Sequence, residues 1–223
     1  MGTMDPPRTW TFAMVDLAGF TALTESHGDD LAADLATTFA DLAAQHLGPG
    51  DRLVKTLGDA VLLAALEPAA GLHLVRRLLD SCYAIPDFPI ARAGIHHGPA
   101  VERGGDLFGA AVNLTARVAA QAAGGQTLAT GGVAHAATEL GMETVALGRF
   151  EMRNVGEPVD LWEIALGPSR SGTAIDPVCR MQVEQTRTSD HLRHDGSDYW
   201  FCSLACAGQF AADPERFVAP PST

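Results

Sequence analysis

Apolar residues in the first half of the chain form both short β-type runs and longer stretches with helical spacing. The run from Trp10 to Leu17 predicts a buried strand that carries the carboxylate of Asp16 near its end. A turn at 18–21 then leads into a helix, which Gly48-Pro49-Gly50 ends. One packed face of this helix is predicted from four residues at helical spacing, namely Leu31, Leu35, Phe39 and Leu42.

The segment 53–64 predicts a β-hairpin, because two apolar, β-rich runs meet at a Gly58-Asp59 reversal. Two charged residues interrupt it, Lys55 and Asp59. Burying a charge in such a hairpin is costly unless it meets a ligand, a metal or a partner. The alternative is a solvated hairpin end, since most charged side chains are exposed.

The remaining pattern predicts further helices over 68–83, 110–123 and 132–140, and strands over 89–97 and 126–129. Gly98-Pro99 is expected to end the first of these strands, and a short ribbon with a glycine turn follows over 101–106. A final hairpin is predicted from 143–153 and 159–165. Because hairpins lie between helices, the order favours an α+β layer arrangement over a doubly wound sheet.

The composition limits the classes of partner. The 223 residues suit one ordinary domain plus a small module, and a hydrophobic content of 47% supports a core. A net charge of −12 argues against a nucleic-acid partner, although a metal ion can neutralise a small polyphosphate locally. No apolar run is long enough to span a membrane, and residues 1–7 lack the features of a signal peptide, so we expect a cytoplasmic protein.

Linker composition at 167–173 predicts a boundary between a domain over 8–166 and a module over 174–219. Of the four cysteines, only Cys82 lies in the first domain, where it is expected to be a core residue. In a reducing compartment the clustering of the others suggests metal or redox chemistry more than disulfides. Cys202 and Cys206 are four residues apart, so both thiols lie on one helical face and suit one ion.

Polar residues of the first domain form a candidate phosphate site. Asp16 and Asp59, delivered from adjacent strand ends, can hold hard ions such as Mg²⁺ or Mn²⁺. The helix start after Asp16 offers backbone N–H groups to phosphate oxygens. Asn113 and Arg117 lie four apart on one helical face, where they can clamp a ribose and a phosphate. A solvated or salt-bridged Arg117 is the alternative.

Four segments in series resemble the class III adenylate/guanylate cyclase catalytic domain over about residues 8–166. They are Asp16-Leu17-Ala18-Gly19-Phe20-Thr21, Lys55-Thr56-Leu57-Gly58-Asp59, Gly94-Ile95-His96-His97-Gly98 and the run from Asp106 to Arg117. The resemblance implies a ferredoxin-like α+β core that works as a homodimer, with the active site between two catalytic domains. His96 and His97 are expected to be structural.

The resemblance also implies residue roles. Asp16 and Asp59 match the residues that bind two Mg²⁺ or Mn²⁺ ions, and Lys55 with Asp106 matches the adenine-reading pair. Substrate-binding roles are further implied for the segment Gly19, Phe20 and Thr21, and for Arg153, which replaces a lysine. Asn113 matches the residue that orients the ribose, and Arg117 the one that stabilises charge on the α-phosphate. In a homodimer the carboxylates of one chain would face Lys55, Asp106, Asn113 and Arg117 of the other.

The C-terminal segment resembles the YHS domain over about residues 174–218, through Asp176-Pro177-Val178-Cys179 and Phe201-Cys202-Ser203-Leu204-Ala205-Cys206. Arg180 stands where that family usually has a small residue. YHS domains are associated with metal binding, so Cys179, Cys202 and Cys206 are implied ligands of Zn²⁺ or another soft metal. The candidates for a fourth ligand are His194, His191, Asp176 and water. A metal-free fold with three reduced cysteines is the alternative.

The implied reaction converts ATP into 3′,5′-cyclic AMP and pyrophosphate. The six principal positions all carry the expected residue types, which favours an active enzyme. They are Asp16, Lys55, Asp59, Asp106, Asn113 and Arg117. The alternatives are a guanylate cyclase, a domain that binds nucleotide without turnover, and a protein whose main task is metal sensing in the cysteine module. Fusion of the two parts suggests that metal or redox state at this module regulates the cyclase.

Overall fold

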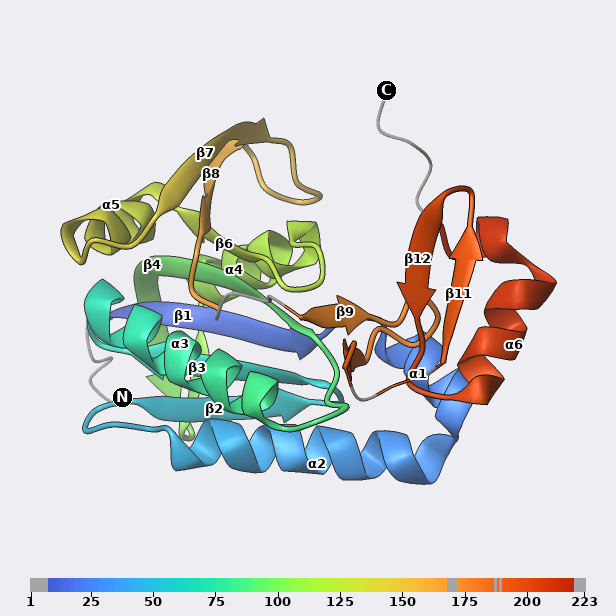
Figure 1. Ribbon diagram of the computed structural model, residues 1–223. Coiled ribbons are helices and arrows are strands. Elements are labelled where there is room, and N and C mark those ends of the chain that lie inside the picture. The colour runs from blue at the N-terminus through green and yellow to red at the C-terminus, as the bar shows by residue number, and fades with distance from the viewer. Residues whose placement is uncertain (1–7, 168–171, 187, 189, 219–223) are drawn as a thin grey trace.

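The computed structural model describes residues 8–167, 172–186, 188 and 190–218, and shows a mixed sheet with helices on both faces and a small module beside it (Figure 1). The predicted linker over 167–173 lies largely outside the described residues. The first part comprises β1 (Arg8–Leu17), α1 (Phe20–His27), α2 (Asp29–Gln45), β2 (Arg52–Leu57), β3 (Ala60–Ala65), α3 (Pro68–Ala84), β4 (Ala91–Arg103), β5 (Asp106–Phe108), α4 (Ala110–Gln121), β6 (Thr127–Thr130), α5 (Gly131–Glu139), β7 (Thr144–Phe150) and β8 (Val159–Ile164). The module comprises β9 (Thr173–Ile175), β10 (Gln182–Glu184), β11 (His191–His194), β12 (Ser197–Trp200), α6 (Leu204–Ala212) and a 3₁₀ turn (Pro214–Arg216).

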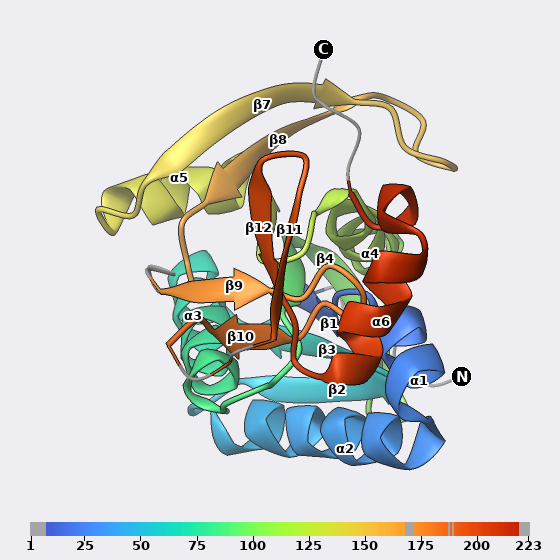
Figure 2. The ribbon, with the colours of Figure 1, turned by 45° about the vertical axis from the view of Figure 1, so that its right-hand side comes forward.

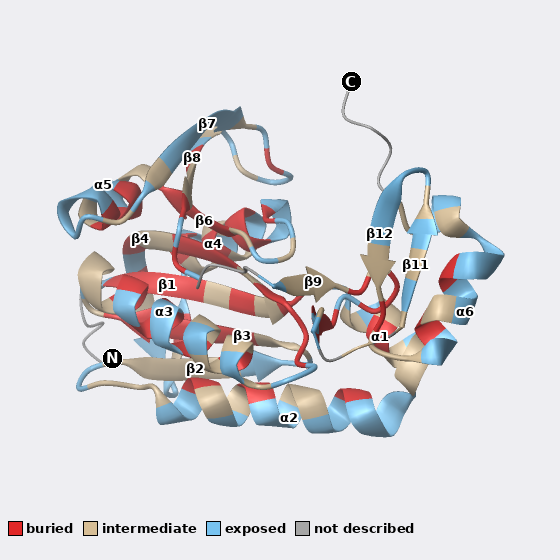
Figure 3. Cartoon of the chain, viewed as in Figure 1, coloured by how far each residue is buried: buried red, intermediate tan, exposed pale blue. Residues whose placement is uncertain are grey.

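The main sheet has the strand order β2-β3-β1-β4-β6-β8-β7, with β5 paired to the far end of β4. The β4–β6 pair is parallel and the other pairs are antiparallel. Hairpins between helices thus produce a mixed sheet, which confirms the α+β prediction. Burial is deepest in the central strands, while β7 at the edge is mostly exposed (Figure 3).

Alternation along β1 separates the two faces of the sheet. Val15 and Leu17 join the core beneath α2, α3 and α5, whereas Trp10 and Phe12 join a second core beneath α4. Asp16 therefore lies on the α4 face. Lys55 pairs in register with Leu62, whose side chain belongs to the same second core. The charged residues of β1 and β2 thus share a face with the helix that carries Asn113 and Arg117.

Two local predictions were wrong. The helix predicted around Leu31 is divided in two, because Gly28, with a φ of +88°, ends α1 and α2 starts afresh at Asp29. Within α2, Leu35, Phe39 and Leu42 pack on the core as predicted, whereas Leu31 near its start is 38% exposed. The second error concerns β4, which continues through Pro99 to Arg103. Its pairing with β6 stops at Ile95, so a proline beyond that point breaks no bond of the β6 ladder.

His96 and His97 occupy structural positions on β4. The Nδ1 atom of His97 lies 2.8 Å from Thr11 Oγ1, and that of His96 lies 2.8 Å from Thr130 Oγ1. Burial, together with the neighbouring His97, lowers the pKa of His96. Both imidazoles thus have hydroxyl partners within the domain.

We expect His96 to make the fold sensitive to acid. The unfolded chain, with a pKa near the ordinary value of about 6.5, binds this proton more tightly than the folded chain. The free energy of unfolding therefore falls as the pH drops through about 6.5, and levels off below the lowered pKa. In urea unfolding, His96→Gln is expected to lose less free energy of unfolding between neutral and acidic pH than wild type does. His135→Gln, which removes an exposed imidazole, is the control and is expected to lose as much as wild type. A loss in His96→Gln equal to that of wild type would contradict this prediction.

The C-terminal module packs against α1 and the start of α2, as two views of the ribbon show (Figures 1 and 2). Leu23 and Ala32 share one buried cluster with Val178, Phe201 and Phe210. Backbone hydrogen bonds also join the module to the segment just before β4. Ile90 N–H donates to the carbonyl of Arg180, and Gln182 N–H donates to that of Phe88. The module and the sheet domain therefore share a core.

Candidate functional site

Two acidic side chains meet where β1 ends beside the β2–β3 hairpin. Asp16 pairs in register with Ala60, and the N–H of Leu17 donates to the carbonyl of Asp59 at 3.1 Å. Burial raises the pKa of Asp59, and the nearby charge of Asp16 raises it further. The structure thus brings the two predicted carboxylates together, in a setting where a cation would relieve their repulsion.

Arg92 on β4 holds Asp16 and was missed by the sequence reasoning. Its Nε donates to Asp16 Oδ1 at 2.7 Å and its Nη2 to Oδ2 at 2.9 Å, which is a bidentate pair. The hydrogen bonds to Asp16 raise the pKa of Arg92. A lone arginine within the apolar run 89–97 was the available signal. Each carboxylate oxygen keeps a second lone pair, so Asp16 can still accept a metal ion.

Lys55 and Asp106 come together although they are 51 residues apart in sequence. Lys55 Nζ donates to Asp106 Oδ2 at 2.7 Å, while Asp106 Oδ1 accepts the N–H of Leu107. The hydrogen bond from Lys55 lowers the pKa of Asp106. The Lys55 ammonium also lies 5.6 Å from the centre of the Phe108 ring. The pair presents a donor and an acceptor side by side on one chain.

The other predicted contacts are exposed. Asn113 and Arg117 lie on the outer face of α4, and neither side chain has a hydrogen-bonding partner within the described part of the chain. Arg153 is exposed in the loop after β7. Gly19, with a φ of +75°, precedes Phe20 and Thr21 at the start of α1. Asn113, Arg117 and Arg153 are therefore available to a ligand, whereas Phe20 packs against the main core and the module.

The three predicted cysteine ligands converge with a histidine that the sequence reasoning did not select. Cys179, Cys202 and Cys206 group with His27, the last residue of α1, and their ligand atoms all lie within 4.8 Å of one another. The sulfur atoms of Cys179 and Cys202 lie 3.4 Å apart, and His27 Nε2 lies 3.5 Å from Cys202 Sγ. Three sulfurs and one imidazole nitrogen form a donor set typical of zinc.

The structure places the earlier candidates for the fourth ligand elsewhere. His194 packs edge-on against Phe210 and pairs with Asp195, while His191 pairs with Asp198. Asp176 is fully buried, and its carboxylate accepts the N–H groups of Val178 and Cys202, each at 2.8 Å. Asp176 thus supports the cysteine-bearing turns, and His27 rather than His194 lies beside the three thiols.

The thiols differ in electrostatic setting. Hydrogen bonds from the other two thiols lower the pKa of Cys206, whereas Cys202, Cys206 and burial raise that of Cys179. Cys82, by contrast, is buried in the main core, which raises its pKa to about 12. This confirms that Cys82 is a core residue.

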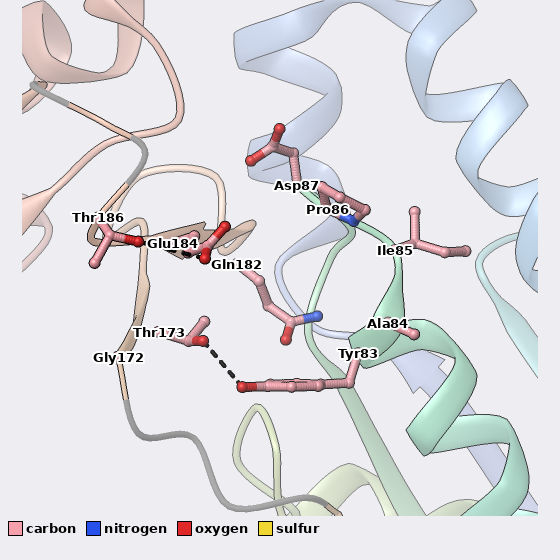
Figure 4. A pocket seen from close by; sticks show the side chains of 10 residues that line it. All are labelled: Tyr83, Ala84, Ile85, Pro86, Asp87, Gly172, Thr173, Gln182, Glu184 and Thr186. Carbon is pink, nitrogen blue, oxygen red and sulfur yellow. Dashed lines mark hydrogen bonds between the residues drawn. The ribbon is translucent and has the colours of Figure 1, made fainter.

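A cleft of about 410 Å³ lies between the end of α3 and the module (Figure 4). Tyr83, Asp87 and Gln182 line it, and the Tyr83 hydroxyl lies 3.0 Å from Thr173 Oγ1. None of the predicted site residues lines this cleft, so it forms no part of the candidate site.

An acidic pair at a strand end, a lysine–aspartate pair and a helix with free asparagine and arginine define a class III nucleotidyl cyclase. The chain belongs to the adenylate and guanylate cyclase catalytic domain family, whose model matches residues 5–164. A second model, that of the YHS domain, matches residues 174–220. This establishes the family of both parts.

Among curated proteins, a pH-sensitive adenylate cyclase from Mycobacterium tuberculosis is 34% identical over 170 residues, which cover 74% of this chain and 43% of that protein. An adenylate cyclase from Streptomyces griseus is 38% identical over 104 residues, covering 46% of this chain and 26% of that protein. The chain thus spans less than half the length of these relatives.

Solved structures agree on the fold. An adenylate cyclase from Trypanosoma brucei in its monomeric state superposes with a TM-score of 0.65 at 21% identity, covering 76% of this chain and 96% of that one. An adenylate/guanylate cyclase/hydrolase from Silicibacter pomeroyi gives a TM-score of 0.62 at 24% identity, covering 74% and 99%. Across the described residues, no helix has the length and apolar character that crossing a bilayer requires.

Proposed function

We propose that the protein is an adenylate cyclase that converts ATP into 3′,5′-cyclic AMP and pyrophosphate. The observation that carries the choice of substrate is the Lys55–Asp106 pair, whose polar atoms lie 2.7 Å apart. A lysine ammonium can donate to N1 of adenine, and an aspartate can accept from its N6 amine. Guanine, with an acceptor at O6 and a donor at N1, reverses this pattern and is disfavoured.

Asp16 and Asp59 would hold two Mg²⁺ or Mn²⁺ ions. Both offer hard oxygen ligands, and burial followed by the charge of Asp16 raises the pKa of Asp59. Such ions, when bound, acidify the attacking hydroxyl and stabilise charge on the phosphates. Arg92 holds Asp16 in place through both carboxylate oxygens.

The remaining residues bind and orient the substrate. The amides at Gly19, Phe20 and Thr21 face phosphate oxygens, and Arg153 contributes a cation. Asn113 orients the ribose so that O3′ attacks the α-phosphorus. The proton of the 3′-hydroxyl passes to water. The bond between the α-phosphorus and the bridging oxygen breaks, and pyrophosphate leaves. Arg117 stabilises the charge that develops on the α-phosphate oxygens, where one such donor contributes on the order of 10²–10³ in rate.

The active unit is proposed to be a homodimer with two shared sites. Leu57 and Phe108 are 51% and 50% exposed, although each is a large apolar residue next to a charged group of the site. A second chain that covers them would bury apolar area and bring its own α4 over the carboxylates. Each chain then supplies Asp16 and Asp59 to one site, and Asn113 and Arg117 to the other.

Product identification tests this function. Purified protein is incubated with equimolar ATP and GTP in the presence of Mn²⁺, and the cyclic products are separated. We expect cyclic AMP and an equal amount of pyrophosphate, with cyclic GTP a minor product. Predominant cyclic GTP would favour a guanylate cyclase, and binding of ATP without turnover would favour a non-catalytic nucleotide-binding domain.

The module is proposed to regulate the cyclase through metal or redox state. Cys202 is only partly buried, and it touches α1 through His27. A change at the thiols therefore has a direct physical route into the catalytic domain.

A further inference from the structure

We propose that His27 is the fourth ligand of a tetrahedral metal site that belongs to both domains, so that a bound soft metal ion fastens helix α1 of the cyclase domain to the C-terminal module. The three thiols come from the module, and the imidazole comes from the catalytic domain, 175 residues before Cys202. Zn²⁺ is the ion that this donor set fits best.

The spacing of the four ligand atoms supports a tetrahedral site. Zn–S bonds of about 2.3 Å and Zn–N bonds of about 2.0–2.1 Å place neighbouring ligand atoms about 3.5–3.8 Å apart. The sulfur distances are 3.4 Å for Cys179–Cys202 and 3.7 Å for Cys202–Cys206. His27 Nε2 lies 3.5 Å from Cys202 Sγ and 3.7 Å from Cys206 Sγ, and all four ligand atoms lie within 4.8 Å of one another. An ion at the centre thus requires little rearrangement.

Groups around the ligands fix their orientation. The buried Asp176 carboxylate accepts the N–H of Cys202 at 2.8 Å and that of Cys179 at 3.4 Å. The hydroxyl of Ser203 accepts the N–H of Cys206 at the start of α6. Such supporting bonds preorganise ligands before the ion arrives. All three cysteine-bearing segments are therefore held independently of the metal.

His27 is brought to the thiols by packing. Leu23, one turn earlier on α1, is fully buried in the cluster that contains Cys179, Phe201 and Phe210. Gly28 then ends the helix immediately after His27. The imidazole therefore projects from a helix whose inner side is already covered by the module, and its position follows from a shared core.

The site is coupled to the segment proposed to face the triphosphate, and this part rests on the proposed function. The eight residues of α1 span about 12 Å, with His27 at one end and Phe20 at the other. A second link runs through Arg180, the residue after Cys179. The Arg180 side chain lies so close to Gly19 that a Cβ added to Gly19 would overlap it. Metal occupancy can thus order the start of α1 from two sides.

Metal titration of the full-length, reduced protein tests the assignment without nucleotide. We expect one Zn²⁺ per chain, and X-ray absorption with three sulfurs and one nitrogen. His27→Ala is expected to weaken Zn²⁺ binding at least about 100-fold, since loss of even a supporting residue costs 10–100-fold. His27→Cys is expected to restore binding with four sulfurs, which separates ligation from any effect on folding.

His194→Ala is the matched control, because it removes the histidine favoured by the module's sequence alone. We expect it to bind Zn²⁺ as wild type does. Metal binding lost in His194→Ala but kept in His27→Ala would overturn the proposal, as would wild type that binds no Zn²⁺. Hydrogen exchange completes the test: Zn²⁺ is expected to slow exchange along α1 in wild type and not in His27→Ala. Inactivity towards ATP would leave these results unaffected and would refute only the proposed function.

Discussion

Asp59→Ala is expected to lower cyclic AMP formation on the order of 10³-fold or more, because the site loses one of the two carboxylates that hold divalent ions at the phosphates. The fold is expected to survive, since burial raises the pKa of Asp59 and its charged form gains little from the folded state. The turnover number with ATP and Mn²⁺ is the measurement.

The matched control for Asp59→Ala is Asp160→Ala, which removes an exposed carboxylate on β8 that pairs with Arg149. We expect this control to retain full activity, because Asp160 has no predicted contact with substrate. If Asp59→Ala kept a tenth of wild-type turnover, the assignment of Asp59 as a metal ligand would be lost.

Gly94→Ala is expected to destabilise the catalytic domain by about 3 kcal/mol or more, and to lower its melting temperature by roughly 6–12 °C. A Cβ at this position of β4 would lie 2.5 Å from the Cα and 2.8 Å from the Cβ of Ala119 on α4. Backbone atoms cannot move aside as a flexible side chain can. Displacing α4 also shifts Asn113 and Arg117, so activity is expected to fall with stability.

Gly132→Ala provides the comparison in the same domain. Gly132 lies in α5, and nothing lies within 4 Å of a Cβ placed there. Alanine in a helix is favoured over glycine by about 0.5–1 kcal/mol, so the melting temperature is expected to stay the same or rise slightly. Thermal unfolding of the two variants side by side tests the close approach of α4 to β4. Equal melting temperatures would contradict it.

Local patterns in the sequence predicted most of the elements. The hairpin over 53–64 formed at Gly58-Asp59 because its apolar runs and its reversal agree with each other. The helix over 68–83 formed with Leu72, Val75 and Leu78 buried, as its spacing predicted. The helix that carries Leu31, Leu35, Phe39 and Leu42 also formed, as α2. Its separation from α1 at Gly28 was not predicted, because periodicity does not register a glycine with a positive φ.

The parts of the site that escaped prediction depend on contacts between distant segments. Asp16 and Arg92 meet across a β1–β4 pairing that no local motif encodes. His27 has no motif of its own, and it reaches the thiols only because Leu23 packs into the module. The sequence of the module itself offers His194 as a fourth ligand and contains no signal that points to His27. A site shared by two domains becomes visible only in the folded chain.

In the proposed homodimer, the carboxylates of one chain and α4 of the other form a single active site. Mixing Asp59→Ala with Arg117→Ala tests it most directly, since each variant retains the half that the other lacks. With random exchange of subunits, half of the dimers are mixed and each has one intact site, so about a quarter of wild-type activity is expected to return. A verified mixed dimer with no activity would contradict the shared site.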